Sequence, residues 1–302
     1  MASCGRSEDK EPQLTPQPSA KEADLIMALT PTLDGLPFFF AQQSGIFDSL
    51  GLKLRIVFYN SQMNAEQALT LNKADVCTSD LFRMSLLQSQ RQPVKMLFST
   101  DRQWMLVANE ALRVNKISQI SSRMVAMTRF SVPAYICDYL STRMSTTKGP
   151  MLTPQINSIV IREKMLAQNQ IDAALLPQPQ ALMSCMKGNT MLFRSARKYD
   201  GYAGIAVRTQ LCYDKKAMKH LLILRKGYNA AVDRLQKNDT LTVSPSIAKI
   251  FGIEGLTSRI HTKDFFSPLS DFKEVKIRSA VNWMKNRGVL RTTYSGDTLV
   301  CY

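Results

Sequence analysis

A folding unit occurs twice in this chain, about 97 residues apart. Residues 27–30 read Met-Ala-Leu-Thr, and residues 125–128 read Val-Ala-Met-Thr. In both places a short polar loop follows, then an apolar residue before proline, then a stretch with helical character. Because each copy must bury its own apolar strand against other elements, the repeat predicts two similar α/β lobes.

A second pair of segments keeps nearly the same offset. The matching residues are Leu69, Asn72 and Asp75 in the first copy and Leu166, Asn169 and Asp172 in the second. A short apolar run follows each segment. Two lobes that present strand ends and helix N-termini to each other enclose a cleft, where small molecules commonly bind. Chance similarity of two βα units is the alternative to duplication.

Apolar runs and helical stretches alternate in the first hundred residues. The predicted strands are 24–30, 52–59, 75–78 and 94–99, and the predicted helices are 37–44, 61–72 and 81–90. Proline at the start of the first helix and Gly45 after its end are the expected helix boundaries. The alternation predicts a mainly parallel sheet with helices on its faces.

The rest of the chain contains the second copy and a helical C-terminal part. The predicted elements of the second copy are a strand at 124–128, a helix after Ser131, a strand at 157–161, a helix at 163–168 and a strand at 173–176. The later helices are predicted at 213–224, 227–237, 244–251 and 273–287. Extended segments at 103–108 and 202–207 are interpreted as two hinge crossings. The predicted division is a flexible tether at 1–23, a first lobe of 24–105 plus 203–302, and a second lobe of 106–202.

The charge of the chain is basic but dispersed. Residues 1–100 carry 9 Lys and Arg against 10 Asp and Glu, whereas residues 101–302 carry 30 against 14. The positive charges form no run of five or six and accompany no stacked-aromatic motif, so we expect a solvated surface and no nucleic-acid partner. No apolar run is long enough to span a membrane.

Cysteine and histidine are placed unfavourably for a metal or catalytic site. The six cysteines show no C-x-x-C spacing, and neither His220 nor His261 has a ligand type nearby. We therefore expect no metal, no cofactor and no histidine-based catalysis. The cysteines in apolar stretches, which we expect to pack as small hydrophobic side chains, are Cys77, Cys137 and Cys185.

Cys4 differs from the other cysteines. It lies in the sequence Ala2-Ser3-Cys4-Gly5, which has the small-small-Cys-Gly form of a bacterial lipoprotein processing site. A polar segment too hydrophilic to fold alone follows it. This pattern predicts lipid attachment at Cys4 and a tether to the membrane surface, and the alternative is a cytosolic protein in which Cys4 occurs by chance.

The segment after the first strand matches a known pattern. The pattern consists of a strand, a loop with proline, a helix of the form A-x-x-x-G-x-F, and then the residues G-L-x-V. The matching residues are Ala41, Gly45, Phe47, Gly51 and Leu52. In this the chain resembles the nitrate, sulfonate and taurine type of ABC-transporter substrate-binding protein, and the related family that binds thiamine pyrimidine precursors.

Two later segments extend the resemblance to residues 24–295. Residues 72–75 (Asn-Lys-Ala-Asp) stand where these families have G-x-x-D, and residues 283–290 (Trp-Met-Lys-Asn-Arg-Gly-Val-Leu) resemble their C-terminal helix. Asn72 replaces the family glycine, and residues 176–179 (Leu-Pro-Gln-Pro) lack an acidic residue before proline. These departures leave the identity of the solute open.

The resemblance implies an α/β, bilobal type II periplasmic-binding-protein fold with a cleft between the lobes. It also implies a monomeric solute-binding lipoprotein in the periplasm that delivers a small anionic or zwitterionic molecule to ABC permease and ATPase subunits. The solute classes it suggests are sulfonates, nitrate and pyrimidine precursors. It implies no enzymatic activity.

The candidate ligand contacts lie at strand ends and helix starts on both sides of this cleft. They are Thr30, Thr32, Asp34, Asn60, Ser61, Ser79 and Asp80 in the first lobe, and Thr128, Arg129, Ser131 and Gln178 in the second. Helix N-termini offer free N–H groups to an anion. The residues for which helix capping is the alternative are Ser61, Asp80 and Ser131. Arg129 is otherwise a surface charge, and Trp104 either stacks on a ligand or packs in the core.

Two functions from other classes remain open. One is an enzyme on the same bilobal fold, such as a menaquinone-pathway dehydratase or a pyrimidine-precursor synthase. The synthases rely on a histidine and a cysteine cluster, and neither occurs near the predicted cleft. The other is the effector domain of a regulator, which no helix-turn-helix precedes.

Overall fold

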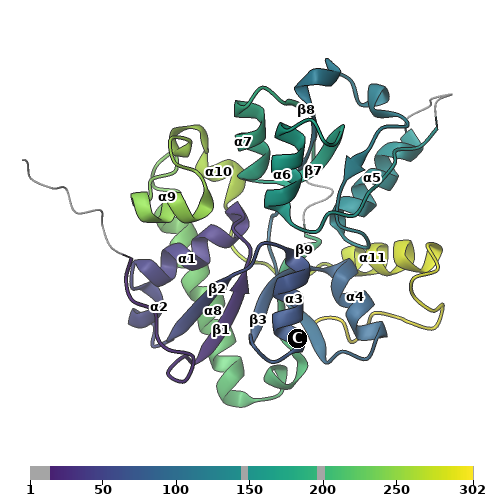
Figure 1. Ribbon diagram of the computed structural model, residues 1–302. Coiled ribbons are helices and arrows are strands. Elements are labelled where there is room, and N and C mark those ends of the chain that lie inside the picture. The colour runs from purple at the N-terminus through teal and green to yellow at the C-terminus, as the bar shows by residue number, and fades with distance from the viewer. Residues whose placement is uncertain (1–13, 144–148, 196–200, 302) are drawn as a thin grey trace, which may run out of the picture.

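Two separate sheets organise the chain (Figure 1). The computed structural model describes residues 14–143, 149–195 and 201–301. The first sheet has the strand order β2-β1-β3-β9-β4, and the second has the order β6-β7-β5-β8. The strands of the first sheet are β1 (Leu25–Leu29), β2 (Leu54–Phe58), β3 (Val76–Asp80), β4 (Val94–Ser99) and β9 (Ala203–Arg208). Those of the second are β5 (Trp104–Ala108), β6 (Val125–Ala126), β7 (Ala173–Pro177) and β8 (Thr190–Arg194).

Helices surround both sheets. Those of the first half are α1 (Leu36–Gln43), α2 (Ile46–Ser49), α3 (Gln62–Thr70) and α4 (Leu81–Ser89). Those that follow are α5 (Val132–Arg143), α6 (Ile159–Ala167), α7 (Gln180–Met186), α8 (Lys215–Leu235), α9 (Pro245–Phe251), α10 (Thr262–Phe265) and α11 (Glu274–Asn286). Short 3₁₀ turns are η1 (Leu33–Gly35), η2 (Glu110–Leu112), η3 (Ile117–Ile120), η5 (Thr209–Cys212) and η6 (Thr257–Arg259).

The first sheet is mainly parallel, as predicted. Strand β1 runs parallel to both β2 and β3. Strand β9 is antiparallel to β3 and β4, because it returns from the second lobe and enters the sheet from the opposite end. Its first residue, Ala203, pairs with Asp80 at the end of β3. The return crossing therefore enters the sheet at the edge where the first lobe presents its strand ends.

The outgoing crossing leads directly into the second sheet. Strand β5 is antiparallel to β7 and β8, and Trp104 at its start pairs with Pro177 at the end of β7. Both crossings thus lie at strand ends that face the other lobe. The exact division of the chain at residues 105/106 and 202/203 stays a prediction.

The repeated unit is confirmed by matching local structure in both copies. Helices α3 and α6 each have 9 residues, and a serine caps each N-terminus: Ser61 Oγ accepts from the N–H of Asn64, and Ser158 Oγ from that of Ile161. After each helix an asparagine adopts the left-handed region that few non-glycine residues occupy, with φ of 57° at Asn72 and 59° at Asn169.

An aspartate fixes the start of the next strand in each copy. Asp75 Oδ2 accepts a hydrogen bond from the N–H of Ile26 at 2.8 Å, and Asp172 Oδ2 accepts one from the N–H of Met124 at 2.8 Å. Each carboxylate also has an arginine partner, Arg208 for Asp75 and Arg123 for Asp172. The shared offset therefore reflects one βαβ unit used twice.

Two sequence expectations are wrong. Residues 157–161 were expected to form a strand, but α6 begins at Ile159, because the Ser158 cap outweighs the strand preference of its β-branched neighbours. Two helices were expected at 213–224 and 227–237, but α8 runs unbroken from Lys215 to Leu235 through Gly227. A Cβ atom at Gly227 would lie 2.2 Å from the Phe47 ring, so close packing of α2 on α8 explains this glycine.

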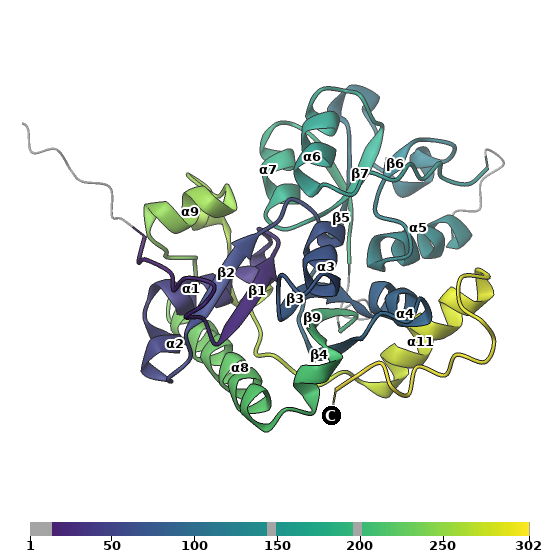
Figure 2. The ribbon, with the colours of Figure 1, turned by 60° about the horizontal axis from the view of Figure 1, so that its bottom comes forward.

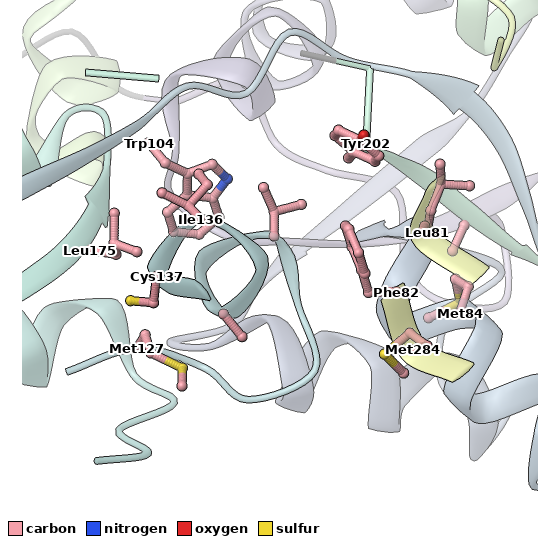
Figure 3. Close-up of a cluster of buried hydrophobic side chains, with 14 of the residues drawn as sticks. Leu81, Phe82, Met84, Trp104, Met127, Ile136, Cys137, Leu175, Tyr202 and Met284 are labelled. Carbon is pink, nitrogen blue, oxygen red and sulfur yellow. The ribbon is translucent and has the colours of Figure 1, made fainter. Parts of the chain in front are cut away.

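A continuous apolar cluster joins the lobes. Figure 3 shows Phe82 of α4 and Met284 of α11 in the same cluster as Trp104 and Leu175 of the second sheet. Helix α11 lies beside α4 and beneath α5 in Figures 1 and 2. The Trp283 ring contacts Phe82 at a centroid distance of 5.3 Å, and its Nε1 donates to Asp138 of α5 at 2.9 Å. The C-terminal helix therefore contacts both lobes.

The ends of the described chain are attached to the first lobe. In the predicted tether, Gln17 Oε1 accepts from the N–H of Ile56 of β2 at 2.7 Å, and Thr15 bonds to Gln43 at the end of α1. At the other end, a disulfide joins Cys212 to Cys301. Cys77 and Cys137 are buried free thiols, whereas Cys185 is half-buried. Cys4 lies outside the described residues.

Candidate functional site

A small closed cavity lies between the lobes. Its volume is about 10 Å³, which is room for about one water molecule. Its walls come from the loop after β1, the start of α3, the crossing before β5, and the starts of α5 and α6. The lining residues are Thr30, Thr32, Gln62, Arg102, Trp104, Thr128, Ser131, Pro133, Asn157, Ile159, Arg162 and Pro177.

Three buried N–H donors at this cavity have no hydrogen-bond partner. They are Nη2 of Arg102, Nε1 of Trp104 and Nε of Arg162. In the described part of the chain only two other buried side-chain atoms lack a partner, on Gln180 and Arg208. A buried donor without a partner costs about 1–3 kcal/mol, and more when it is charged. Three in one cavity mark it as the candidate site for acceptor atoms, whether from water or from a ligand.

Arg162 is the least compensated of the three. Ser158 caps α6, which places Ile159 and Arg162 on the same buried face, and the Arg162 side chain is only 2% exposed. Its Nη1 donates to the carbonyl oxygen of Leu175 in β7 at 2.7 Å, and no carboxylate among the described residues forms an ion pair with it. Burial lowers the pKa of Arg162 to about 10, so the guanidinium remains charged at neutral pH. An uncompensated buried cation favours an anionic ligand.

Arg102 is held by a carboxylate, which leaves one amino group toward the cavity. Its Nε donates to both oxygens of Asp34, at 3.0 and 3.1 Å, and its Nη1 donates to Gln62 Oε1 at 3.3 Å. Thr100 Oγ1 donates to Asp34 as well, at 3.1 Å. Because Asp34 neutralises Arg102, the net charge at the cavity is the single positive charge of Arg162. The site therefore suits a group with one negative charge.

Behind the cavity, Gln62 connects Arg102 to a buried polar network of the first lobe. Its Nε2 donates to Asp80 Oδ2 at 2.7 Å and to Glu66 Oε1 at 3.0 Å. Glu66 also accepts from Ser79 Oγ at 2.7 Å and pairs with Arg83 at 2.9 Å. These partners fix the Gln62 amide, and with it the position of Arg102.

Asp80 is the titratable group of this network. Burial raises the pKa of Asp80 from 3.8 to about 6, although hydrogen bonds from Gln62 and from the N–H of Arg83 oppose the shift. Asp80 also caps α4 through that second bond, at 3.0 Å. Its protonation state can therefore change within the pH range of living cells.

Two loops join the lobes by hydrogen bonds. The N–H of Leu33, after β1, donates to the carbonyl oxygen of Gln178 at 2.9 Å. Gln180 Nε2 donates to the carbonyl oxygen of Pro31, also at 2.9 Å. The structure therefore shows the lobes in contact, with strand ends of one touching strand ends of the other.

The predicted contact residues fall into several groups. Those that line the cavity are Thr30, Thr32, Thr128 and Ser131. Those in the buried polar network around it are Asp34, Ser79 and Asp80. Ser61 and Asp80 cap helices α3 and α4, and the half-buried Gln178 accepts from the N–H of Leu182 in α7. Those that are exposed are Asn60 and Arg129, and Arg129 lines an open groove beside the cavity. Ligand contact by any of them stays a prediction.

Sequence reasoning missed three important residues: Gln62, Arg102 and Arg162. For Arg162 a signal existed, because the repeat offset of 97 places it at the position of Ala65, on the buried face of the helix. A charged residue at a buried repeat position marks a site. Arg102 lies in a short polar crossing and has no such signal.

A family model described as NMT1/THI5 like matches residues 33–233. No curated protein matches the sequence.

Solved structures share the fold. The alkanesulfonate-binding protein SsuA from Xanthomonas axonopodis pv. citri, bound to MOPS, superposes with a TM-score of 0.71 at 11% identity, over 95% of this chain and 99% of that chain. The periplasmic nitrate-binding protein NrtA from Synechocystis PCC 6803 gives 0.65 at 11% identity, over 89% and 82%. A Candida albicans protein with the generic periplasmic binding protein fold gives 0.60 at 14% identity, over 91% and 92%. The predicted bilobal fold is confirmed.

Proposed function

The chain belongs to the NMT1/THI5-like family, and from this premise we propose that it is a solute-binding protein that captures a small anion for an ABC importer. The observation that supports this most directly is the buried, uncompensated Arg162 beside two further unpartnered N–H donors. A sulfonate, nitrate or carboxylate group would supply both the negative charge and the acceptor atoms. The sulfonate- and nitrate-binding proteins that share the fold support the same solute class.

The ligand's charged group would occupy the cavity between the lobes. There it would accept hydrogen bonds from Arg102, Trp104 and Arg162, and the hydroxyl groups of the lining threonines and Ser131 can donate to it. Charge-assisted hydrogen bonds contribute about 1.5–3 kcal/mol each. Two or three of them, with partial burial of the ligand, are enough for micromolar affinity, which corresponds to about −8 kcal/mol.

The same lining supports binding rather than catalysis. Among the described residues that line the cavity there is no histidine, cysteine or carboxylate. Nucleophilic and acid–base mechanisms usually rely on these groups. We therefore place the enzyme alternative second.

The cellular setting is part of the proposal. We propose an exported monomer, anchored through lipid on Cys4, that works with permease and ATPase subunits. The Cys212–Cys301 disulfide supports an oxidising compartment. No helix in the described part of the chain combines the length and the apolar character that crossing a bilayer requires. Labelling with palmitate, with Cys4→Ala as the control, tests the anchor: label that persists in the variant contradicts it.

Calorimetry tests the binding function. The protein is dialysed into a buffer without sulfonates and titrated with nitrate, methanesulfonate and larger sulfonates. We expect binding by wild type, and a loss of at least about 100-fold in Arg162→Met, because a buried charge pair is worth about 3 kcal/mol or more. Arg291→Met, at an exposed arginine, is the matched control and should bind as wild type does. If no anion binds wild type, or if Arg162→Met binds equally well, the proposal is wrong.

A further inference from the structure

The cavity is too small for the whole of a captured molecule. Its volume of about 10 Å³ holds about one water molecule, so the lobes would have to move slightly apart for an anionic head to enter, and the rest of the molecule would lie outside. An open groove of about 560 Å³ lies immediately beside it. Asn157 lines both spaces, and Glu66 of the groove accepts a hydrogen bond from Gln62 of the cavity at 3.0 Å. Cavity and groove are therefore neighbouring parts of one cleft.

The groove lies between helices α3 and α4 of the first lobe and two loops of the second, and we call it the α3–α4 groove. Its floor is the buried Glu66–Arg83 ion pair, at 2.9 Å. Its first-lobe wall includes the exposed amides of Asn64 and Gln67, one helical turn apart on α3. Its second-lobe wall includes Arg129 and Gln155, which are also exposed.

The charges of the α3–α4 groove select against a cationic group. Arg83 neutralises Glu66, so Arg129 supplies the remaining charge of the lining residues. Arg129 offers only N–H donors, and the amides of Asn64 and Gln67 offer donors as well as acceptors, so a neutral group with carbonyl oxygens can bind to all three. An ammonium group has no acceptor and would meet the positive charge of Arg129. An alkyl chain could contact the apolar part of the lining but would leave the polar groups to water; the apolar residues are Met63, Leu86, Leu87 and Phe130.

From these observations we infer that the captured solute is an organic anion with a tail. Its anionic head enters the cavity, and an uncharged tail bearing hydrogen-bond acceptors lies in the α3–α4 groove. This inference rests on the proposed function and adds to it a second binding region and a class of ligand. Inorganic anions and amino-sulfonates would then be poor ligands.

Four probes with the same head test the inference by calorimetry on wild type. They are methanesulfonate, with no tail; taurine, with an ammonium tail; butane-1-sulfonate, with an alkyl tail; and N-acetyltaurine, with a neutral amide tail. We expect N-acetyltaurine to bind about 10-fold more tightly than the other three, as two added hydrogen bonds would give. Equal affinities, or a preference for taurine or for butane-1-sulfonate, would overturn the inference and leave the proposed function intact. No binding by any anion would instead reject the proposed function.

A variant in the α3–α4 groove tests the contribution of the tail to affinity separately from that of the head. Gln67→Ala removes one donor from the wall of the groove, and it should reduce the preference for N-acetyltaurine over methanesulfonate about fivefold. Gln210→Ala, at an exposed glutamine of η5 outside the groove, should keep the wild-type preference. If Gln67→Ala also keeps it, the Arg129→Ala variant decides: a preference unchanged in both variants means that the tail does not lie in this groove.

Discussion

The two copies of the repeated unit share a backbone and a buried, ion-paired glutamate, Glu66 in the first and Glu163 in the second, but the second copy adds a buried cation, Arg162. In the first copy, Glu66 of α3 has Arg83, Ser79 and Gln62 as partners. In the second, Arg162 of α6 has one backbone carbonyl and no carboxylate among the described residues. The first copy pairs its buried charges internally, whereas the second leaves the charge of Arg162 without a carboxylate partner among the described residues. The shared unit thus forms the scaffold of both lobes, and the difference between the copies lies at the proposed site.

The largest predicted effect is on stability, and it follows from replacing Arg83, the buried cation that has an ion-pair partner. Replacing Arg83 by methionine leaves Glu66 buried without its ion-pair partner, which should lower the free energy of unfolding by about 3–5 kcal/mol. Urea denaturation of wild type and variant measures this, and Arg291→Met should stay within about 0.5 kcal/mol of wild type. A loss below about 1 kcal/mol for Arg83→Met would show that the first copy does not depend on its internal pairing.

The next prediction concerns the pH dependence of folding stability, to which Asp80 of the first copy contributes. Asp80 has a folded pKa raised from 3.8 to about 6, and the second copy has Pro177 at the corresponding position, which cannot titrate. A raised carboxyl pKa means that the folded state binds the proton more tightly. This contribution to stability is therefore full below about pH 4 and is lost as pH rises through about 6. It amounts to about 3 kcal/mol.

Denaturation of wild type and Asp80→Asn at pH 4 and pH 7 measures this term. Asparagine does not titrate, so the loss of stability between the two pH values should be smaller in the variant by up to about 3 kcal/mol. The same loss in both proteins would show that Asp80 ionises freely in the folded state.

Replacing Arg162 should change the free energy of unfolding in the opposite direction from replacing Arg83. With no ligand present, Arg162→Met removes an uncompensated buried charge, so the free energy of unfolding should rise by about 1–4 kcal/mol. Thermal and urea unfolding of the ligand-free proteins measure this. A variant that is less stable than wild type would mean that Arg162 is a structural residue, and the contrast between the two copies would fail.

The smallest effect compares the two matching aspartates. Asp75 and its partner Arg208 are each 17% exposed in their side chains, whereas Asp172 meets Arg123 at 3.8 Å and that arginine is 51% exposed. Asparagine keeps an acceptor for the backbone N–H but loses the ion pair. We expect a loss of about 1 kcal/mol for Asp75→Asn and less than about 0.5 kcal/mol for Asp172→Asn. Equal losses would show that exposure does not set the difference.

Much of the fold could be predicted from the sequence, because strand patterns and helix boundaries depend on residues that are close together in the chain. Alternating apolar and polar stretches predicted the strands of the first sheet, and prolines and glycines marked the helix ends. The strand expected at 157–161 failed because the preference of β-branched residues was weighed without the Ser158 cap. The expected break in α8 at Gly227 failed because the reason for that glycine is contact with Phe47, 180 residues away in sequence.

The site was harder to predict, because its chemistry depends on contacts distant in sequence. Strand ends and helix starts correctly indicated which loops face the cavity, and Thr30 and Thr128 line it. That Asp34 holds Arg102, 68 residues away, could not be read from either residue alone. Arg162 was within reach, since alignment of the two copies exposes a charge where the first copy has a buried alanine.

The two tryptophans lie in different places between the lobes, so their fluorescence can report on two different events. The chain contains only Trp104 and Trp283. The first presents an unpartnered indole N–H to the cavity, and the second lies where α11 contacts both lobes. Emission from Trp104 would thus report on what enters the cavity, and emission from Trp283 on whether the lobes separate. In a Trp283→Phe variant, Trp104 would be the single tryptophan, so entry of the proposed solute into the cavity could be followed by fluorescence without any attached dye.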